Sequence, residues 1–228
     1  MSSSPRDMGQ DAPRTRCIRC GQCCITSSPT LHIQDLHLIE SDLLRKNRLY
    51  TIRKGEMVRD PVKGALTKAR EEMIKIKEKS GMGDGCLFYD GQKKACRIYE
   101  KRPAQCASLK CWDTRDFMAV YERPKLRRKD VIHDGVLLGL IESHEDRCGY
   151  SKVEDSVTRI RREGEKAVER LIDLMKFDFN LRPFVSQKLD INQDEMGFCF
   201  GRPLTETISM YGLKVTQEPD GSFFLTKA

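Results

Sequence analysis

The chain has 228 residues, of which 39% are hydrophobic and 33% charged, so it can bury a core and is not disordered throughout. Its longest strongly apolar stretch, residues 136–141, is far too short to cross a lipid bilayer, which excludes a helical membrane span. The 41 basic and 34 acidic residues leave a formal net charge of +7, a mild excess that permits an acidic partner without requiring one.

The first segment, residues 1–14, is expected to be a disordered leader. It is rich in Ser, Pro, Asp, Gln and Arg and lacks the apolar centre of a secretory signal. We therefore expect a cytoplasmic protein. This matters because the chain has ten cysteines, and clustered thiols in a reducing compartment hold metal more often than they form disulfides.

Two short elements are predicted after the first cysteines. Leucine and isoleucine recur at helical spacing over residues 34–46, which indicates a short amphipathic helix. Between Met73 and Glu78, isoleucines alternate with lysines, which is typical of a strand with one face in water.

A β-hairpin is predicted around the turn Asp90-Gly91. Apolar and aromatic residues precede the turn and follow it, at 87–89 and 95–99. Because Cys86 and Cys96 flank this hairpin, we expect their two thiols to lie close together.

The C-terminal half is predicted to contain one long helix and a second hairpin. Residues 151–154 have the form of a capping box, and apolar residues then keep one face over about residues 153–176, despite Gly164. Residues 213–216 and 222–226 flank a turn rich in Pro, Asp and Gly, which predicts the terminal hairpin.

The first cysteine group is the sequence CIRCGQCC. Cys17, Cys20 and Cys23 recur every three residues, a spacing that lets one tight loop present three sulfurs to one cubane cluster. Adjacent side chains usually diverge, so Cys23 and Cys24 are not expected to bind the same ion, and one of them is assigned to a second centre. The second group comprises Cys86, Cys96, Cys106 and Cys111.

At these residues the sequence resembles the YkgJ-like CxxCxxCC cysteine-cluster family. The residues that fit its pattern are Cys17, Cys20, Cys23, Cys24, Cys86, Leu87, Phe88, Cys96, Ile98, Tyr99, Arg102, Pro103 and Cys106. The resemblance spans about residues 17–111 and implies a zinc- or iron-chelating domain. Flagellin lysine methylases share the cysteine pattern and are associated with a four-iron cluster. The resemblance implies no established reaction for this chain.

The spacing favours iron–sulfur over zinc, although four thiolates can hold either. Structural zinc sites usually use two separated C-x2-C pairs, whereas one loop here carries three thiols in register and the other cysteines are separated by 4 to 9 residues. We expect one or two centres, each most simply a [4Fe–4S] cluster, with zinc as the alternative. The predicted ligands are Cys17, Cys20, Cys23, Cys24, Cys86, Cys96, Cys106 and Cys111.

Other polar residues near these groups have a simpler interpretation. His32 and His37 can bind metal but are expected at the surface or in helix caps. The basic runs at 123–129 and 159–162 are expected to be solvated faces. Arg97 and Arg102 adjoin the cysteines and can donate to cluster sulfurs.

The isolated Cys148 and Cys199 are expected to be packed free thiols, because free cysteine is commonly buried. The glycine-rich stretch ending at Gly85 is read as a flexible approach to Cys86.

The expected fold class is α+β, a small cysteine-rich domain of loops and hairpins packed with helices, followed by a helical and hairpin extension. Its predicted parts are residues 1–14, 15–115 and 116–228. The expected function is electron transfer, or service as an accessory subunit of a larger oxidoreductase, with a redox enzyme as partner and nucleic acid not expected. A zinc-stabilised interaction module and a cluster-dependent enzyme of unknown reaction are the alternatives.

Overall fold

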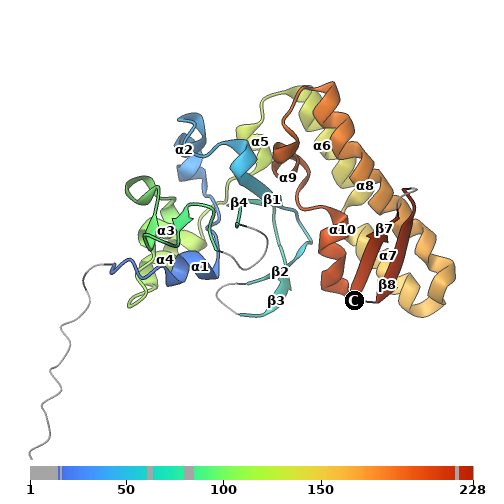
Figure 1. Ribbon diagram of the computed structural model, residues 1–228, viewed down its shortest axis with the longest axis horizontal. Helices are drawn as coiled ribbons and strands as arrows, with labels where there is room; N and C mark the ends of the chain where they lie inside the picture. The colour runs from blue at the N-terminus through green and yellow to red at the C-terminus, as the bar shows by residue number, and fades with distance from the viewer. Residues whose placement is uncertain (1–14, 16, 61–63, 80–84, 219–220, 228) are drawn as a thin grey trace, which may run out of the picture.

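The computed structural model describes residue 15 and residues 17–60, 64–79, 85–218 and 221–227. It combines helices with small antiparallel strand pairs, so the predicted α+β class is confirmed. Figure 1 shows short elements of the cysteine-rich half at one end of the molecule and the long helices with the terminal hairpin at the other. Within the described ranges, no helix is both long enough and apolar enough to cross a membrane.

The elements are short in the first half and longer in the second. The α-helices are α1 (Gln22–Thr26), α2 (Leu36–Glu40), α3 (Ala104–Ser108), α4 (Arg115–Tyr121), α5 (Arg128–Val131), α6 (Gly135–Cys148), α7 (Tyr150–Glu163), α8 (Val168–Lys188), α9 (Met196–Phe200) and α10 (Leu204–Thr207). The 3-10 helices are η1 (Ile33–Asp35), η2 (Lys46–Arg48), η3 (Tyr99–Lys101), η4 (Gly164–Ala167), η5 (Gln193–Glu195) and η6 (Ile208–Tyr211). The strands are β1 (Leu49–Ile52), β2 (Met57–Arg59), β3 (Leu66–Lys68), β4 (Met73–Ile76), β5 (Tyr89–Asp90), β6 (Ala95–Cys96), β7 (Leu213–Gln217) and β8 (Phe223–Lys227).

Strands pair as β1–β4, β2–β3, β5–β6 and β7–β8, all antiparallel. The predicted strand at 73–78 is confirmed as β4, in which Ile74 and Ile76 are fully buried. Their alternation with lysine places one face of the β1–β4 pair in the core. The terminal hairpin is likewise confirmed as β7–β8.

The helix predicted over 34–46 is right in place and wrong in length. Helix α2 ends at Glu40, and Asp42 follows with φ 61°, in the left-handed region. The Leu44 amide then donates to the Leu38 carbonyl at 2.9 Å, so the chain turns back and buries both leucines. The apolar positions beyond Glu40 therefore reach the core through a turn and not through further helix.

The single long helix predicted over 153–176 is wrong, because two helices occupy this stretch. Gly164 has φ 70° and ψ −147°, a conformation that side chains disfavour, and it separates α7 from η4 and α8. Helix α7 begins at Tyr150, and its N-cap Gly149 makes no side-chain cap bond. The predicted capping box is therefore not formed, and α8 packs back against α6 and α7.

Two hydrophobic cores lie side by side in the molecule. The larger one gathers Leu31, Leu49 and Ile74 from the first half with Phe198 and Phe200 of α9. The smaller one lies among α7, α8, α10 and the terminal hairpin. Because the larger core draws on both sides of residue 115, the boundary predicted there stays a prediction.

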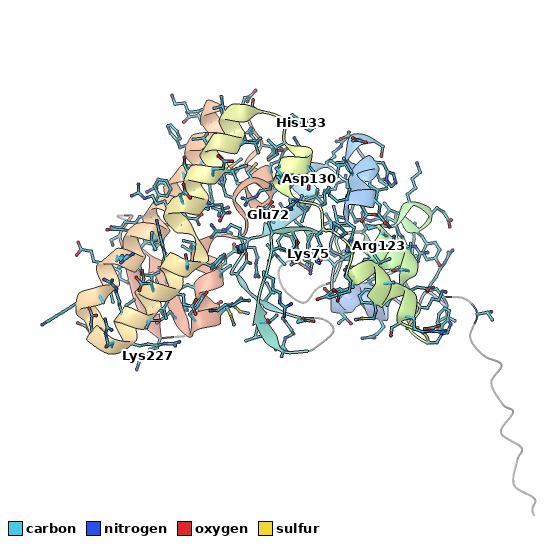
Figure 2. All side chains as sticks on the ribbon, turned by 180° about the vertical axis from the view of Figure 1, so that it is seen from behind. Glu72, Lys75, Arg123, Asp130, His133 and Lys227 are labelled. Carbon is cyan, nitrogen blue, oxygen red and sulfur yellow. The ribbon has the colours of Figure 1, made fainter. Side chains whose placement is uncertain are left out.

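Buried charges connect the two cores. Arg128 donates to Glu72 at 2.5 Å and to Glu145 of α6 at 2.7 Å. The fully buried Arg53 lies 3.5 Å from Glu145, and its guanidinium is 4.6 Å from the centre of the Tyr150 ring. Figure 2 shows the labelled Glu72 near the middle of the molecule, between the two ends.

Candidate metal centre

The first cysteine group lies on an exposed loop that leads into α1. Gly21, the residue before this helix, has φ 80°. Cys17, Cys20 and Cys23 are all exposed, and the Arg19 amide donates to the Cys17 sulfur at 3.3 Å. The loop thus leaves the thiols of Cys17, Cys20 and Cys23 accessible, and their binding to one cluster stays a prediction.

A direct backbone contact fixes this loop on the second cysteine group. The Cys86 amide donates to the Cys24 carbonyl at 2.7 Å. Gly85 has φ +80°, and a Cβ built on it would lie 2.7 Å from that same carbonyl oxygen and 2.9 Å from Ile25 Cα. Glycine is therefore required here for close approach, whereas the sequence analysis assigned Gly85 only flexibility; the residues just before it lie outside the described ranges.

A second close contact lies a few residues earlier in the loop. A Cβ on Gly21 would lie 2.2 Å from the Tyr89 hydroxyl oxygen, so the tyrosine ring occupies the space that a side chain would need. Gly21 and Gly85 together allow the loop that carries Cys17, Cys20 and Cys23 to pack closely against the segment that begins at Cys86. A glycine beside each cysteine group was the signal available in the sequence, but only the fold reveals the positive φ angles and the close contacts.

The hairpin predicted between Cys86 and Cys96 is confirmed as β5–β6. Tyr89 pairs with Cys96 in its register. Cys86 stands just outside the hairpin, in an isolated bridge with Glu78, and its carbonyl accepts from the Tyr89 amide at 2.9 Å. Cys106 lies on α3, which follows the hairpin.

Five thiols influence one another electrostatically. Their positions are Cys23, Cys24, Cys86, Cys96 and Cys106. Burial raises the pKa of Cys106, and negative charge on Cys86, Cys23 and Cys96 raises it further. Burial also raises the pKa of Cys86, with Cys96 acting in the same direction. These mutual effects mean that the thiols from both groups share one end of the molecule.

The adjacent pair is closer than expected. The sulfurs of Cys23 and Cys24 lie 4.0 Å apart, so the expectation that these two side chains diverge is wrong. A hydrogen bond from Cys24 is the largest cause that lowers the pKa of Cys23, to about 6, and the same bond raises the pKa of Cys24. The pair thus tends to hold one proton and one negative charge.

Two arginines cover one ring beside the thiols. The guanidinium carbons of Arg102 and Arg19 lie 3.8 Å and 4.2 Å from the centre of the Tyr99 ring. The positive charge of Arg102 makes a smaller contribution to the lowered pKa of Cys23 than the bond from Cys24 and the backbone hydrogen bonds do, and it opposes the raised pKa of Cys106. The Arg102 Nε is buried, and no described residue accepts its hydrogen bond. An unpartnered donor beside several thiols fits an anionic sulfur-ligated centre.

The described side chains do not form a complete ligand set on their own. No three Cys, His, Asp or Glu side chains within the described ranges stand in an arrangement that would hold a metal ion. Cys111 is exposed, next to the bridge of Lys110 with Asp113. The two groups are therefore brought to one region, and their ligating geometry stays a prediction.

The isolated cysteines and the histidines lie in other surroundings. Cys148 and Cys199 are buried in the two hydrophobic cores, and the Cys148 thiol donates to the Leu174 carbonyl at 3.6 Å. His32 is buried, which lowers its pKa, and of the two expected positions it takes the helix cap: it is the N-cap of η1, where its amide donates to the Asp35 carboxylate at 2.9 Å. His37 is exposed at α2, and its Nδ1 lies 2.8 Å from the Gln34 carbonyl.

Most of the two basic runs take part in contacts within the chain. Lys125 pairs with Glu71 at 3.1 Å, and Arg123 donates to Gln34 at 2.7 Å. In the second run, Arg159 pairs with Asp155. One member of the first run, Arg128, is buried and not solvated as predicted, because it bonds to the buried backbone of α9 and to two carboxylates.

Comparison with known proteins adds one finding. The family model described as "CxxCxxCC: Putative zinc- or iron-chelating domain" matches residues 16–125. None of the curated proteins and none of the solved structures matches the chain. The matched range contains both cysteine groups, the contacts at Gly21 and Gly85, and Arg102. Residues 16–125 of the chain are therefore similar to the CxxCxxCC family of zinc- or iron-chelating domains.

Proposed function

We propose that this protein carries an iron–sulfur centre and serves electron transfer, as a carrier or as an accessory subunit of a larger oxidoreductase in the cytoplasm. One observation carries the proposal. The backbone contact between Cys86 and Cys24, which Gly85 permits, fixes the three-spaced cysteine loop against the segment that supplies Cys96 and Cys106. The similarity of residues 16–125 to a zinc- or iron-chelating family supports metal binding, and the choice of iron–sulfur is ours.

The donor set supports an iron–sulfur centre in two ways. Cys17, Cys20 and Cys23 have the spacing with which a ferredoxin loop holds three corners of a cubane cluster. Arg102 adds a buried N–H donor and a positive charge beside the thiols, and such groups tune cluster sulfurs and offset their negative charge. When bound, the cluster would supply one-electron chemistry, and the chain would hold it through the cysteines of both groups.

Zinc is the second candidate, and the adjacent pair favours it. Two thiolates about 2.3 Å from a tetrahedral ion lie about 3.8 Å from each other. The sulfurs of Cys23 and Cys24 are 4.0 Å apart, which suits two ligands of one ion. In this reading the ion stabilises a binding module and does no redox chemistry.

Metal analysis after anaerobic purification separates the two candidates. Iron together with acid-labile sulfide and a broad visible absorption band is the expected result. Stoichiometric zinc without sulfide would contradict the iron–sulfur proposal and support the second candidate. Reduction by dithionite should bleach the visible band, and a band that does not change would argue against an electron-transfer role.

Serine substitutions test the ligands. Serine at Cys17, Cys20, Cys23, Cys86, Cys96 or Cys106 should lower the metal content, because serine removes the thiolate that binds soft metals. Cys24 and Cys111 complete the predicted set and are measured in the same way. Serine at Cys148 or Cys199 is the matched control and should leave the metal content unchanged, since both lie in hydrophobic cores. Loss of about half of the metal on changing the second group alone would indicate two centres.

A further inference from the structure

The cationic side chains around the cysteines have a feature that the two basic runs lack. Lys93 and Lys94, in the turn of the β5–β6 hairpin, and Lys101, at the end of η3, are exposed. Among the ion pairs of the described residues, none involves these three lysines. Their charges are therefore available to a partner, whereas most of the charges in the two basic runs already have contacts within the chain.

The surface around the thiols is positive overall. We call it the cysteine face and define it as the exposed and half-buried residues of 17–26 and 90–102. Its cations are Arg19, Lys93, Lys94, Arg97, Lys101 and Arg102, and its acids are Asp90 and Glu100. Asp90 is already engaged, because its Oδ1 accepts the amides of Gln92 and Lys93 at 3.1 Å and 3.0 Å.

A bound centre would offset part of this positive charge. Thiolate ligands are anionic, and two cations stack on Tyr99 beside them, Arg102 and the loop's own Arg19. These two guanidinium groups are expected to offset more of the negative charge of the centre than the three lysines do. The three lysines are exposed and take part in none of the ion pairs among the described residues, so we expect their charges to stay available when metal is bound.

Two apolar side chains interrupt the charge beside the thiols. Ile18, next to Cys17, is 59% exposed, and Ile25, next to Cys24, is 42% exposed. Transient protein interfaces commonly have an apolar patch surrounded by a polar or charged rim. The charges increase the rate of association, and the apolar contacts stabilise the complex. Nucleic acid would instead use stacking on aromatic rings. Tyr89 is buried, and Tyr99 is covered by Arg19 and Arg102, so neither ring is open to a base.

We propose that the cysteine face is the docking surface for an acidic protein, which binds through Lys93, Lys94 and Lys101 at the rim and Ile18 and Ile25 at the centre. The proposal rests on the proposed function in one respect: a partner docked here covers the thiols and so lies within short reach of their metal centre. The location of the surface depends only on the exposed charges and the apolar pair.

Binding of three labelled probes to the full chain tests this docking surface by fluorescence anisotropy. The probes are a peptide of eight glutamates, a peptide that adds four leucines to the same eight glutamates, and a nine-nucleotide oligothymidylate. We expect both peptides to bind more weakly as salt rises, since the rim is electrostatic. The leucine-containing peptide should bind more tightly than the all-glutamate peptide. Tighter binding of the oligothymidylate than of the leucine-containing peptide would overturn the proposal in favour of nucleic acid.

Charge reversal locates the surface. The variant K93E/K94E/K101E should weaken binding of both peptides roughly tenfold or more, because like charges then face each other. The matched control is K166E/K176E/K188E, which reverses three exposed lysines of η4 and α8 at the other end of the molecule with the same change in net charge. Equal losses in the two variants would show that only net charge matters and would overturn the proposal.

Removal of the apolar pair tests the centre of the surface. In I18S/I25S the advantage of the leucine-containing peptide should vanish while binding of the all-glutamate peptide stays. An advantage that persists in this variant would contradict the role of the two isoleucines. Metal content and the melting temperature are measured on every preparation. A protein that binds the peptides at the cysteine face but holds no metal would contradict the proposed function and leave the docking surface standing.

Discussion

The two ends of the molecule are held together by different means. At the end with α7, α8 and the β7–β8 hairpin, long helices bury an apolar core that includes Leu171 and Met175. At the cysteine end the elements are short, many of the thiols are exposed, and the segments meet through single backbone contacts such as that between Cys86 and Cys24. Cys86, Phe88 and Tyr89 belong to the edge of the larger core, but the loop that carries Cys17, Cys20 and Cys23 is exposed and buries little apolar surface of its own. We infer that metal supplies the missing cohesion.

Removing the metal should have the largest effect on protease resistance, and only the cysteine end should lose this resistance. In the metal-free protein, we expect protease to cleave within residues 15–111 well before it cleaves α7 or α8, because ligand binding contributes directly to the folding free energy of the cysteine end. Limited proteolysis with mass spectrometry of the fragments measures the order of cleavage. The same digestion pattern with and without metal would show that the cysteine end is stable by itself.

Substitution of one glycine should disturb the cysteine end almost as strongly. In G85A the new Cβ would lie 2.7 Å from the Cys24 carbonyl, at a φ of +80° that costs an alanine about 1–2 kcal/mol before the clash is counted. We expect a clear loss of metal, with α7 and α8 still protected in hydrogen exchange. The matched control is G91A in the hairpin turn, where nothing lies within 4 Å of the new Cβ. If G85A kept its full metal content, the backbone contact would not position the ligands.

At the helical end, pH should act through a buried histidine. The Nε2 of His144 lies 2.7 Å from an Asp178 oxygen, and burial lowers its pKa, helped by Arg53 and Arg182 and opposed by Asp178. Below the ordinary histidine pKa of about 6.5, the unfolded chain takes up a proton that the folded protein does not. The free energy of unfolding should therefore fall as the pH falls from 7 to 5, by on the order of 1 kcal/mol per pH unit at most.

Asp178 acts in the same direction at lower pH. Burial opposes its ionisation, but the hydrogen bond with His144 and the charge of Arg182 depress its pKa. Its contribution is present above the unfolded pKa of about 3.9 and is lost only below it, outside the window of pH 7 to 5. Urea unfolding of H144Q should thus show a flatter dependence on pH in this window, while H37Q, at an exposed position, serves as the control. An unchanged slope in H144Q would assign the pH dependence to other groups.

The smallest expected effect concerns an exposed ion pair. Lys68 of β3 donates to Glu154 of α7 at 2.6 Å, with side chains 53% and 45% exposed. Such pairs contribute little because water screens them, so K68A should change the free energy of unfolding by less than about 1 kcal/mol. Thermal unfolding measures the change, and K176A is the control without an ion pair among the described contacts. A loss of several kcal/mol would mean that this strand contributes far more to the helical end than its exposure indicates.

The sequence was informative where local pattern decides the structure. Alternation of isoleucine and lysine located β4, and turn residues located the β5–β6 and β7–β8 hairpins. The cysteine groups and the family were also readable, because spacing and motif are local properties. The ligand geometry stays a prediction.

What the sequence analysis missed depends on contacts between distant residues. Helix α6 was not recognised although the run 136–141 lies within it, and Gly164 was tolerated inside a helix that it in fact ends. The network of Arg53, His144 and Asp178 joins residues more than thirty positions apart, so no window of sequence reveals it. The need for glycine at residue 85 is also invisible in a window of sequence, because it arises from the close contact with the distant Cys24 carbonyl.

The position of α9 has a consequence for anyone who wishes to work with the family-matched region alone. This helix packs on β1, and its Phe198 carbonyl accepts a hydrogen bond from the Thr51 hydroxyl at 2.6 Å. A protein truncated after residue 125 would lose α9 and expose Leu49 and Ile74, which are otherwise fully buried. We therefore expect such a fragment to aggregate during expression. Co-expression with residues 126–228 should restore its solubility, because the two pieces can then form the shared core again.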